Sequence, residues 1–130
     1  MLWLFRLSRP VLYGACAVVL VLSVIEMHQQ PAFAFSDKVS HLSAFALLAL
    51  LAEFAFPGRR AIRLAMWGLL FYGLFIECVQ WLLPWREFSL FDWLADALGI
   101  LIWMACARRL HRTRFMHMYV AQARASDSSP

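Results

Sequence analysis

The sequence predicts an all-α fold, a four-helix transmembrane bundle with both termini in the cytoplasm. Two observations predict it. Hydrophobic residues make up 63% of the 130 residues and charged residues only 15%, against roughly 45–50% and ~25% in an average soluble domain. The apolar residues also fall into four runs, separated by short connectors that hold proline, glycine or charged residues. A soluble fold of this length could not bury so much apolar surface, so the bilayer is its natural solvent.

The first helix is expected at 10–27, after a short N-terminal segment, 1–9. A helix needs about 20 residues, and at least ~17, to cross ~30 Å of hydrocarbon, so this run is just long enough. Its basic start and the later Ala32-Phe33-Ala34 also fit a secretory signal peptide. The run is long for such a peptide and the cleavage motif lies well beyond its end, so we expect a retained helix.

The other three helices are predicted in the apolar runs that follow: 39–56, 64–83 and 90–107. Pro57 and Gly58 end the second helix, and Pro84 ends the third, because these residues break helices. Residues 10–107 therefore form one membrane domain. The remaining residues, 108–130, form a basic tail that ends in S-D-S-S-P, a composition typical of disorder.

The basic residues predict the orientation of the bundle. Ten of the twelve lie in the N-terminal segment, the 57–63 turn and the tail, whereas the other two connectors hold only Lys38 and Arg86. Cytoplasmic loops are enriched in Lys and Arg, so we expect a multi-pass protein of the cell (inner) membrane with Lys38 and Arg86 outside. The basic residues flank apolar spans and form no patch interleaved with aromatic residues, so no nucleic-acid partner is expected.

Polar residues recur at helical spacing near the outer end of the membrane domain. One face of the third helix carries residues spaced four and three apart: Gly73, Glu77 and Gln80. One face of the fourth helix carries Ser89, Asp92, Asp96 and Gly99. His41 lies at a similar depth on the second helix, with Asp37, Lys38 and Arg86 just above it. Ionisable groups in apolar spans are costly, so they predict a functional site.

Several chemistries fit this set of residues. His41, Glu77 and Asp92 could bind a divalent metal ion, because catalytic zinc sites often use three such ligands plus water, but their spacing carries no metal signature and no cofactor is predicted. Lys38 and Arg86 could hold a phosphate or carboxylate group. Glu77 or Asp92 could act as a general base. The same residues could also form a hydrogen-bond network that only holds the helices together.

Three ordered motifs resemble those of the VanZ-like family of small membrane proteins, over about residues 37–104. D-K-V-S-H-L-S-A-F is similar to the family's D-K-x-x-H-x-x-x-F, and Y-G-L-F-I-E-C-V-Q to its Y-G-x-x-x-E-x-x-Q. P-W-R-E-F-S-L-F-D-W-L-A-D-A-L-G is similar to its P-x-R-x-x-S-x-x-D-x-x-x-N-x-x-G. One position departs, since Asp96 stands where the family usually has Asn. An Asp there must be protonated or paired, with His41, Lys38 or Arg86 as the partner.

The resemblance implies a polytopic protein of the cell envelope. The family's founding member is linked to resistance to the glycopeptide antibiotic teicoplanin, a role that resemblance alone does not transfer. Besides membrane lipid, we expect the ligand to be the head group of an envelope lipid or glycan precursor. The residues expected to bind it are Asp37, Lys38, His41, Glu77, Gln80, Arg86, Ser89, Asp92 and Asp96.

Two other functions stay open from the sequence. One is an intramembrane enzyme acting on a lipid-linked substrate, with His41, Glu77 and Asp92 as the catalytic candidates. The other is a structural scaffold for partner proteins. A homo-oligomer that completes the polar cluster across an interface is compatible with either of them.

Overall fold

The computed structural model describes residues 2–25, 33–110, 118 and 121, and this part of the chain is helical with no strands. It contains four helices, and each has an apolar stretch long enough to cross a membrane. They are α1 (Leu2–Val24), α2 (Phe33–Ala55), α3 (Arg59–Trp81) and α4 (Leu90–Leu110). The predicted all-α fold with four membrane-spanning helices is confirmed, and the chain is a multi-pass membrane protein.

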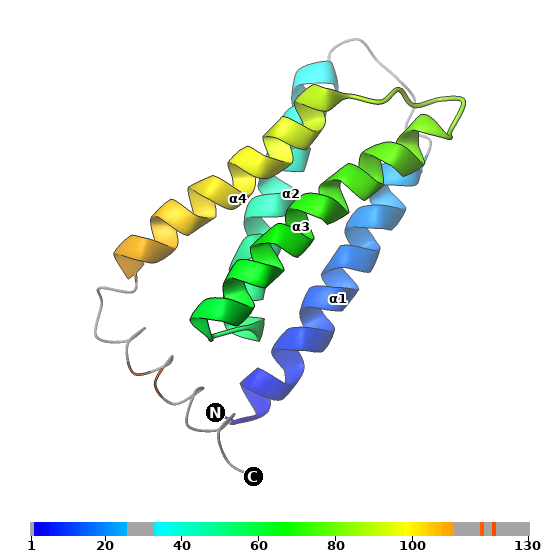
Figure 1. The fold of residues 1–130 in the computed structure, drawn as a ribbon. Coiled ribbons are helices and arrows are strands. Elements are labelled where there is room, and N and C mark those ends of the chain that lie inside the picture. Colours follow the sequence, from blue (N-terminus) through cyan, green and yellow to red (C-terminus); the bar gives the residue numbers. More distant parts are fainter. Residues whose placement is uncertain (1, 26–32, 111–117, 119–120, 122–130) are drawn as a thin grey trace.

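The four helices run alternately in opposite directions. The start of α1, the α2–α3 turn and the end of α4 lie at one end of the bundle, and the α3–α4 loop lies at the other (Figure 1). The basic residues Arg59, Arg60, Arg108 and Arg109 belong to the first end. This distribution is the basis for predicting that the first end is cytoplasmic, and the orientation stays a prediction. Arg112, Arg114 and Arg124 of the tail lie outside the described residues.

Three helices begin earlier than the apolar runs suggest, α1 and α2 by the most residues. α1 starts at Leu2 and continues through Pro10, which a membrane helix tolerates because neighbouring groups can satisfy the freed carbonyl. α2 starts at Phe33, so Asp37 and Lys38 belong to its first turns and not to a connector. The prediction started each helix after the polar residues. At a membrane surface, however, a helix can extend beyond its apolar run into the interface. Glu26 and Ala32 lie outside the described residues.

The ends of α3 and α4 also differ from the apolar runs. α3 begins at Arg59, so the basic turn after Gly58 forms its first helical turn. It ends at Trp81 with Leu82 as its C-cap, since Leu83 precedes Pro84 and a residue before proline is disfavoured in the α conformation. α4 continues to Leu110. The α3–α4 loop is therefore longer than predicted, and its Arg86 contacts Asp37 near the start of α2.

α2 lies at the centre of the bundle and packs most closely against α4. Gly99 makes this possible, because a Cβ atom there would clash with the backbone oxygen of Leu42 and would lie 3.0 Å from the nitrogen of Ala46. Small residues allow membrane helices to approach closely in this way. The fully buried Phe45 and Ile76 belong to the same core. α3 and α4 also contact each other, but the closest packing is between α2 and α4.

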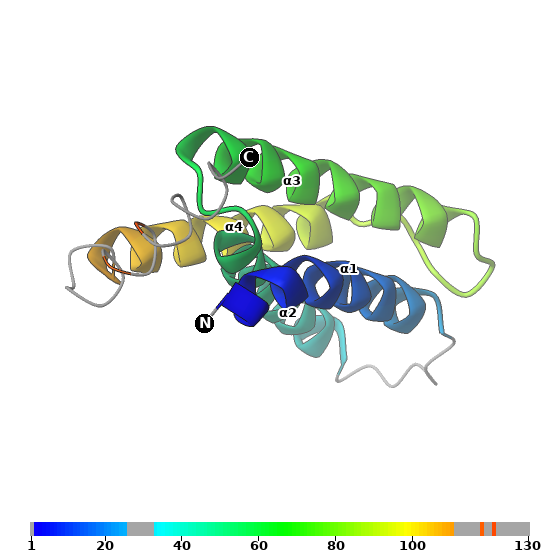
Figure 2. The ribbon, with the colours of Figure 1, turned by 90° about the horizontal axis from the view of Figure 1, so that it is seen from below.

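α1 is the peripheral helix. Only 11% of its membrane-spanning stretch is buried, against 33% for α2. Figure 2 shows α1 beside α2 at the edge of the bundle. Side chains of α3 reach α1 by donating hydrogen bonds to its backbone: Tyr72 Oη to the Cys16 carbonyl (2.6 Å) and Gln80 Nε2 to the Ser23 carbonyl (3.0 Å). Besides the apolar packing of Leu12, Val19 and Leu20 against the core, these two hydrogen bonds attach α1 to α3.

Candidate functional site

A histidine–aspartate pair joins α2 to α4 at the centre of the site. His41 Nδ1 lies 2.9 Å from Asp96 Oδ1, with Asp96 fully buried and His41 nearly so. Asp96 is the residue that departs from the family pattern, and three partners were predicted for it. The structure shows that His41 is the partner. Gly73 of α3 makes room for the carboxylate, because a Cβ atom there would lie 2.6 Å from Asp96 Oδ2. The fold therefore holds Asp96 between α2 and α3.

Glu77 and Ser89 connect α3 to the start of α4. Ser89 is the N-cap of α4, and its Oγ accepts a hydrogen bond from the Asp92 N–H (3.3 Å). The Ser89 N–H donates to Oε2 of the fully buried Glu77 (3.0 Å). In a capping box the residue three positions after the cap accepts this N–H. Here Glu77 takes that role from another helix, so the carboxylate of Asp92 can face α2.

Replacing Ser89 with alanine should lower the free energy of unfolding by about 1 kcal/mol, the usual effect of losing an N-cap side chain. The Asp92 N–H would lose its Ser89 Oγ acceptor. Unfolding of the purified protein in mixed micelles by a denaturing detergent measures the change. Ser89→Thr, which keeps a hydroxyl, is the control and should stay close to wild type. Equal stability of Ser89→Ala and wild type would contradict the capping role.

Two ion pairs lie at the outer edge of the site. Lys38 Nζ is 3.4 Å from Asp92 Oδ1, and Arg86 Nη1 is 3.2 Å from Asp37 Oδ2. The first pair joins α2 to α4, and the second joins the α3–α4 loop to α2. Both cations predicted to hold an anionic group are thus engaged with acids, so an anionic ligand would have to compete with these carboxylates.

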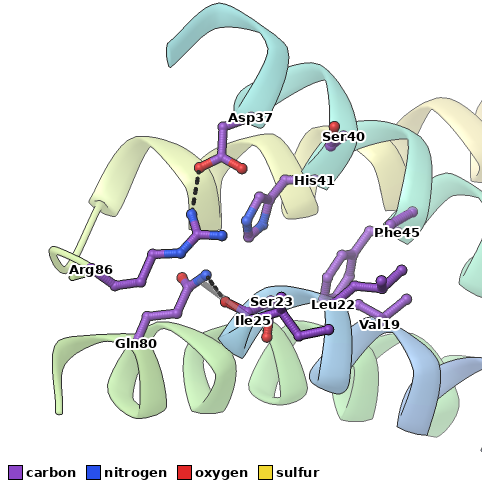
Figure 3. Close-up of a pocket in the computed structure, with 11 residues that line it drawn as sticks. Val19, Leu22, Ser23, Ile25, Asp37, Ser40, His41, Phe45, Gln80 and Arg86 are labelled. Atoms are coloured by element: carbon purple, nitrogen blue, oxygen red, sulfur yellow. Dashed lines mark hydrogen bonds and ion pairs between the residues drawn. The ribbon is translucent and has the colours of Figure 1, made fainter. Parts of the chain in front are cut away.

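A pocket of about 270 Å³ opens between α1 and α2 beside these pairs. Its wall on α1 is mainly apolar and includes Val19, Leu22 and Ile25. Polar side chains gather at one end of the pocket, where Arg86 and Gln80 reach towards α2 and α1 (Figure 3). The remaining lining residues are Ser23, Asp37, Ser40, His41, Ala44 and Phe45. The pocket therefore offers both apolar and hydrogen-bonding contacts.

The structure separates the nine predicted site residues into groups. His41, Glu77, Asp92 and Asp96 are buried between α2, α3 and α4. Asp37, Lys38 and Arg86 form the outer ion pairs, Ser89 caps α4, and Gln80 turns away towards Ser23 of α1. The trio that could bind a metal according to the sequence, His41, Glu77 and Asp92, is not one of the groups that lie close enough together. Among the described residues these groups are Asp37, His41 and Asp92, and His41, Glu77 and Asp96.

Sequence reasoning missed the contribution of α1. Val19, Leu22 and Ser23 line the pocket, yet an apolar run in lipid gives no signal for which of its faces meets protein. Tyr72, part of a family motif, has a second role as a hydrogen-bond donor to α1. A tyrosine hydroxyl deep in an apolar run is the one signal that could have indicated this attachment.

Four membrane-spanning helices around a buried cluster of ionisable side chains define a small polytopic membrane protein with an internal polar site. A family model described as VanZ/LLP1 matches residues 18–111, well over half of the chain. The chain belongs to the VanZ/LLP1 family. No curated protein and no solved structure matches it. The match covers the whole polar cluster and begins within α1.

Proposed function

We propose that this protein binds the polar head group of an envelope lipid or glycan precursor at the outer leaflet of the cell (inner) membrane. The pocket between α1 and α2 carries the proposal. Its volume of about 270 Å³ is just below the roughly 300–1,000 Å³ of typical small-molecule sites. It therefore suits a head group or a short segment of a ligand whose chains stay in the bilayer.

Arg86 is the group we expect to recognise an anionic head group. Its guanidinium has five N–H donors, and the ion pair with Asp37 uses Nη1. A phosphate can engage the other donors in a bidentate manner, while Gln80 and His41 supply further hydrogen-bonding groups at the same end. The family's link to glycopeptide resistance fits a binder of envelope precursors and extends to this chain only as part of this proposal.

Filling the pocket should abolish this binding. Leu22 lines the pocket but is largely exposed, so Leu22→Trp should block it without disturbing the core. We expect a polyprenyl phosphate or phosphatidylglycerol to raise the Tm of the wild type in a neutral detergent. The affinity measured for Leu22→Trp should be at least tenfold weaker, equivalent to about 1.4 kcal/mol.

The matched control is Leu101→Trp on α4, where the leucine is similarly exposed but does not line the pocket. It should respond to both lipids as the wild type does. Arg86→Gln should weaken the response to phosphate-bearing lipids more than the response to zwitterionic phosphatidylethanolamine. Equal rises in Tm for all variants would indicate that the lipids bind nonspecifically. That result would contradict the pocket as a binding site.

A second candidate is an intramembrane enzyme acting on a lipid-linked substrate. The observation that favours it is the position of His41, which lines the pocket and is held by the Asp96 carboxylate. A carboxylate that orients an imidazole in this way is a common arrangement for acid–base chemistry. Under this alternative, product detected by mass spectrometry should disappear in Glu77→Gln or Asp92→Asn while the fold is kept. A pure binder would give no product in any variant.

A further inference from the structure

One side chain from each of α2, α3 and α4 meets below the outer ion pairs. His41, Glu77 and Asp96 each place a ligand-type atom within 4.8 Å of the other two, and all three residues are buried. The trio thus links the three helices at one point. It lies behind the pocket, which His41 lines.

Two oxygens of this trio have no hydrogen-bond partner among the residues that the structure describes. Glu77 uses Oε2 to accept the Ser89 N–H, and Asp96 uses Oδ1 to contact His41, but Glu77 Oε1 and Asp96 Oδ2 are buried and unpaired. Asp96 Oδ2 is directed at α3 over Gly73, one helical turn from Glu77. A buried acceptor without a partner destabilises the fold, and more so when it is charged. Both oxygens therefore point to a missing cationic or donor partner.

The charges around the trio favour a cation. The cluster contains four carboxylates, of which Asp92 and Asp37 are paired with Lys38 and Arg86. Glu77 and Asp96 form no ion pair with a Lys or Arg in the described part of the chain, and they share His41 as their basic neighbour. The overlapping trio of Asp37, His41 and Asp92 is disfavoured, because Lys38 and Arg86 lie at its carboxylates and would repel a metal ion.

We propose that His41, Glu77 and Asp96 bind one divalent transition-metal ion, Zn²⁺ or Mn²⁺. An imidazole with two carboxylates is a donor set that suits these ions, whereas Mg²⁺ and Ca²⁺ prefer sites made only of oxygen ligands. Ligand atoms about 2.1 Å from a tetrahedral zinc ion lie about 3.4 Å apart. The ligand atoms of the trio lie within 4.8 Å of one another, so the side chains need to close by up to about 1.4 Å. Three protein ligands leave a coordination position open, and the pocket gives a path to it.

The experiment measures Zn²⁺ and Mn²⁺ binding to the full-length protein in detergent after removal of metal with a chelator. We expect about one equivalent of metal per chain, measured by elemental analysis after gel filtration, and a Mn²⁺ electron paramagnetic resonance signal that differs from the aqueous ion. Glu77→Gln and Asp96→Asn should each weaken binding at least tenfold. Both substitutions keep the size of the side chain, and circular dichroism with gel filtration checks that each variant is folded.

The matched control is Glu87→Gln in the exposed α3–α4 loop, which should bind metal as the wild type does. Asp37→Asn should also keep binding, because Asp37 belongs to the other trio. No metal on folded wild type, or unchanged binding in both Glu77→Gln and Asp96→Asn, would overturn the proposal. So would loss of binding in Asp37→Asn alone. The readout is metal content, so the result does not depend on what the pocket binds.

Discussion

Gly99→Ala should lower the free energy of unfolding by about 3 kcal/mol, at the upper end of typical overpacking effects. The added Cβ atom would clash with the backbone oxygen of Leu42 and press on the nitrogen of Ala46. Backbone atoms of a central helix cannot rotate away as a flexible side chain can. α2 and α4 would have to separate, and the His41–Asp96 pair between them would be strained. Unfolding in mixed micelles by a denaturing detergent measures the loss.

Gly68→Ala is the matched control for this experiment. Gly68 lies within α3, and a Cβ atom there would meet no atom within 4 Å. The same substitution should leave stability unchanged or raise it by up to about 1 kcal/mol, because alanine favours a helix more than glycine does. If the two variants had the same stability, the close approach of α2 and α4 at Gly99 would not be what holds this pair together.

His41→Ala should lower the free energy of unfolding by about 3–5 kcal/mol, the range found when one member of a buried ion pair is removed. Asp96 is fully buried and would keep a carboxylate without its imidazole partner. Glu77 would lose the same neighbour. The measurement is made in metal-free buffer with a chelator, so that a bound ion does not contribute to the stability of the wild type.

A double-mutant cycle separates the interaction energy of His41 and Asp96 from the effect of shortening either side chain alone. Removing Asp96 in the His41→Ala background should cost much less than removing it from the wild type, because the unpaired charge disappears with it. Asp96→Asn alone should be mild, since an amide can still hydrogen-bond His41. Strict additivity of His41→Ala and Asp96→Ala would show that the two side chains do not interact, against the 2.9 Å contact.

The four helices could be predicted from hydropathy, but their neighbours could not. The third and fourth helices are joined by a short loop and do contact each other, but the closest packing is between α2 and α4. Gly99 allows this close approach, and a glycine in an apolar run does not indicate which helix will pack against it. The first three helices start earlier than predicted, and in α2 the residues Asp37 and Lys38 are polar and yet helical.

The composition of the polar cluster could be predicted because each ionisable group stands out in an apolar background. The hydrogen bonds and ion pairs between these groups could not be predicted. Asp96 had three candidate partners, and only the geometry selects His41. The hydrogen bond from the Ser89 N–H to Glu77 crosses between helices, so no local pattern reveals it. The part of α1 that lines the pocket is apolar except for Ser23, so the sequence does not indicate which of its faces meets protein.

The position of α1 at the edge of the bundle separates the two halves of this site. The buried trio belongs to α2, α3 and α4, whereas one wall of the pocket belongs to α1. Only 11% of the spanning stretch of α1 is buried, so most of this helix faces the bilayer. Under the proposed function, a molecule already dissolved in the bilayer would reach the pocket sideways, between α1 and α2, without breaking the Arg86–Asp37 pair.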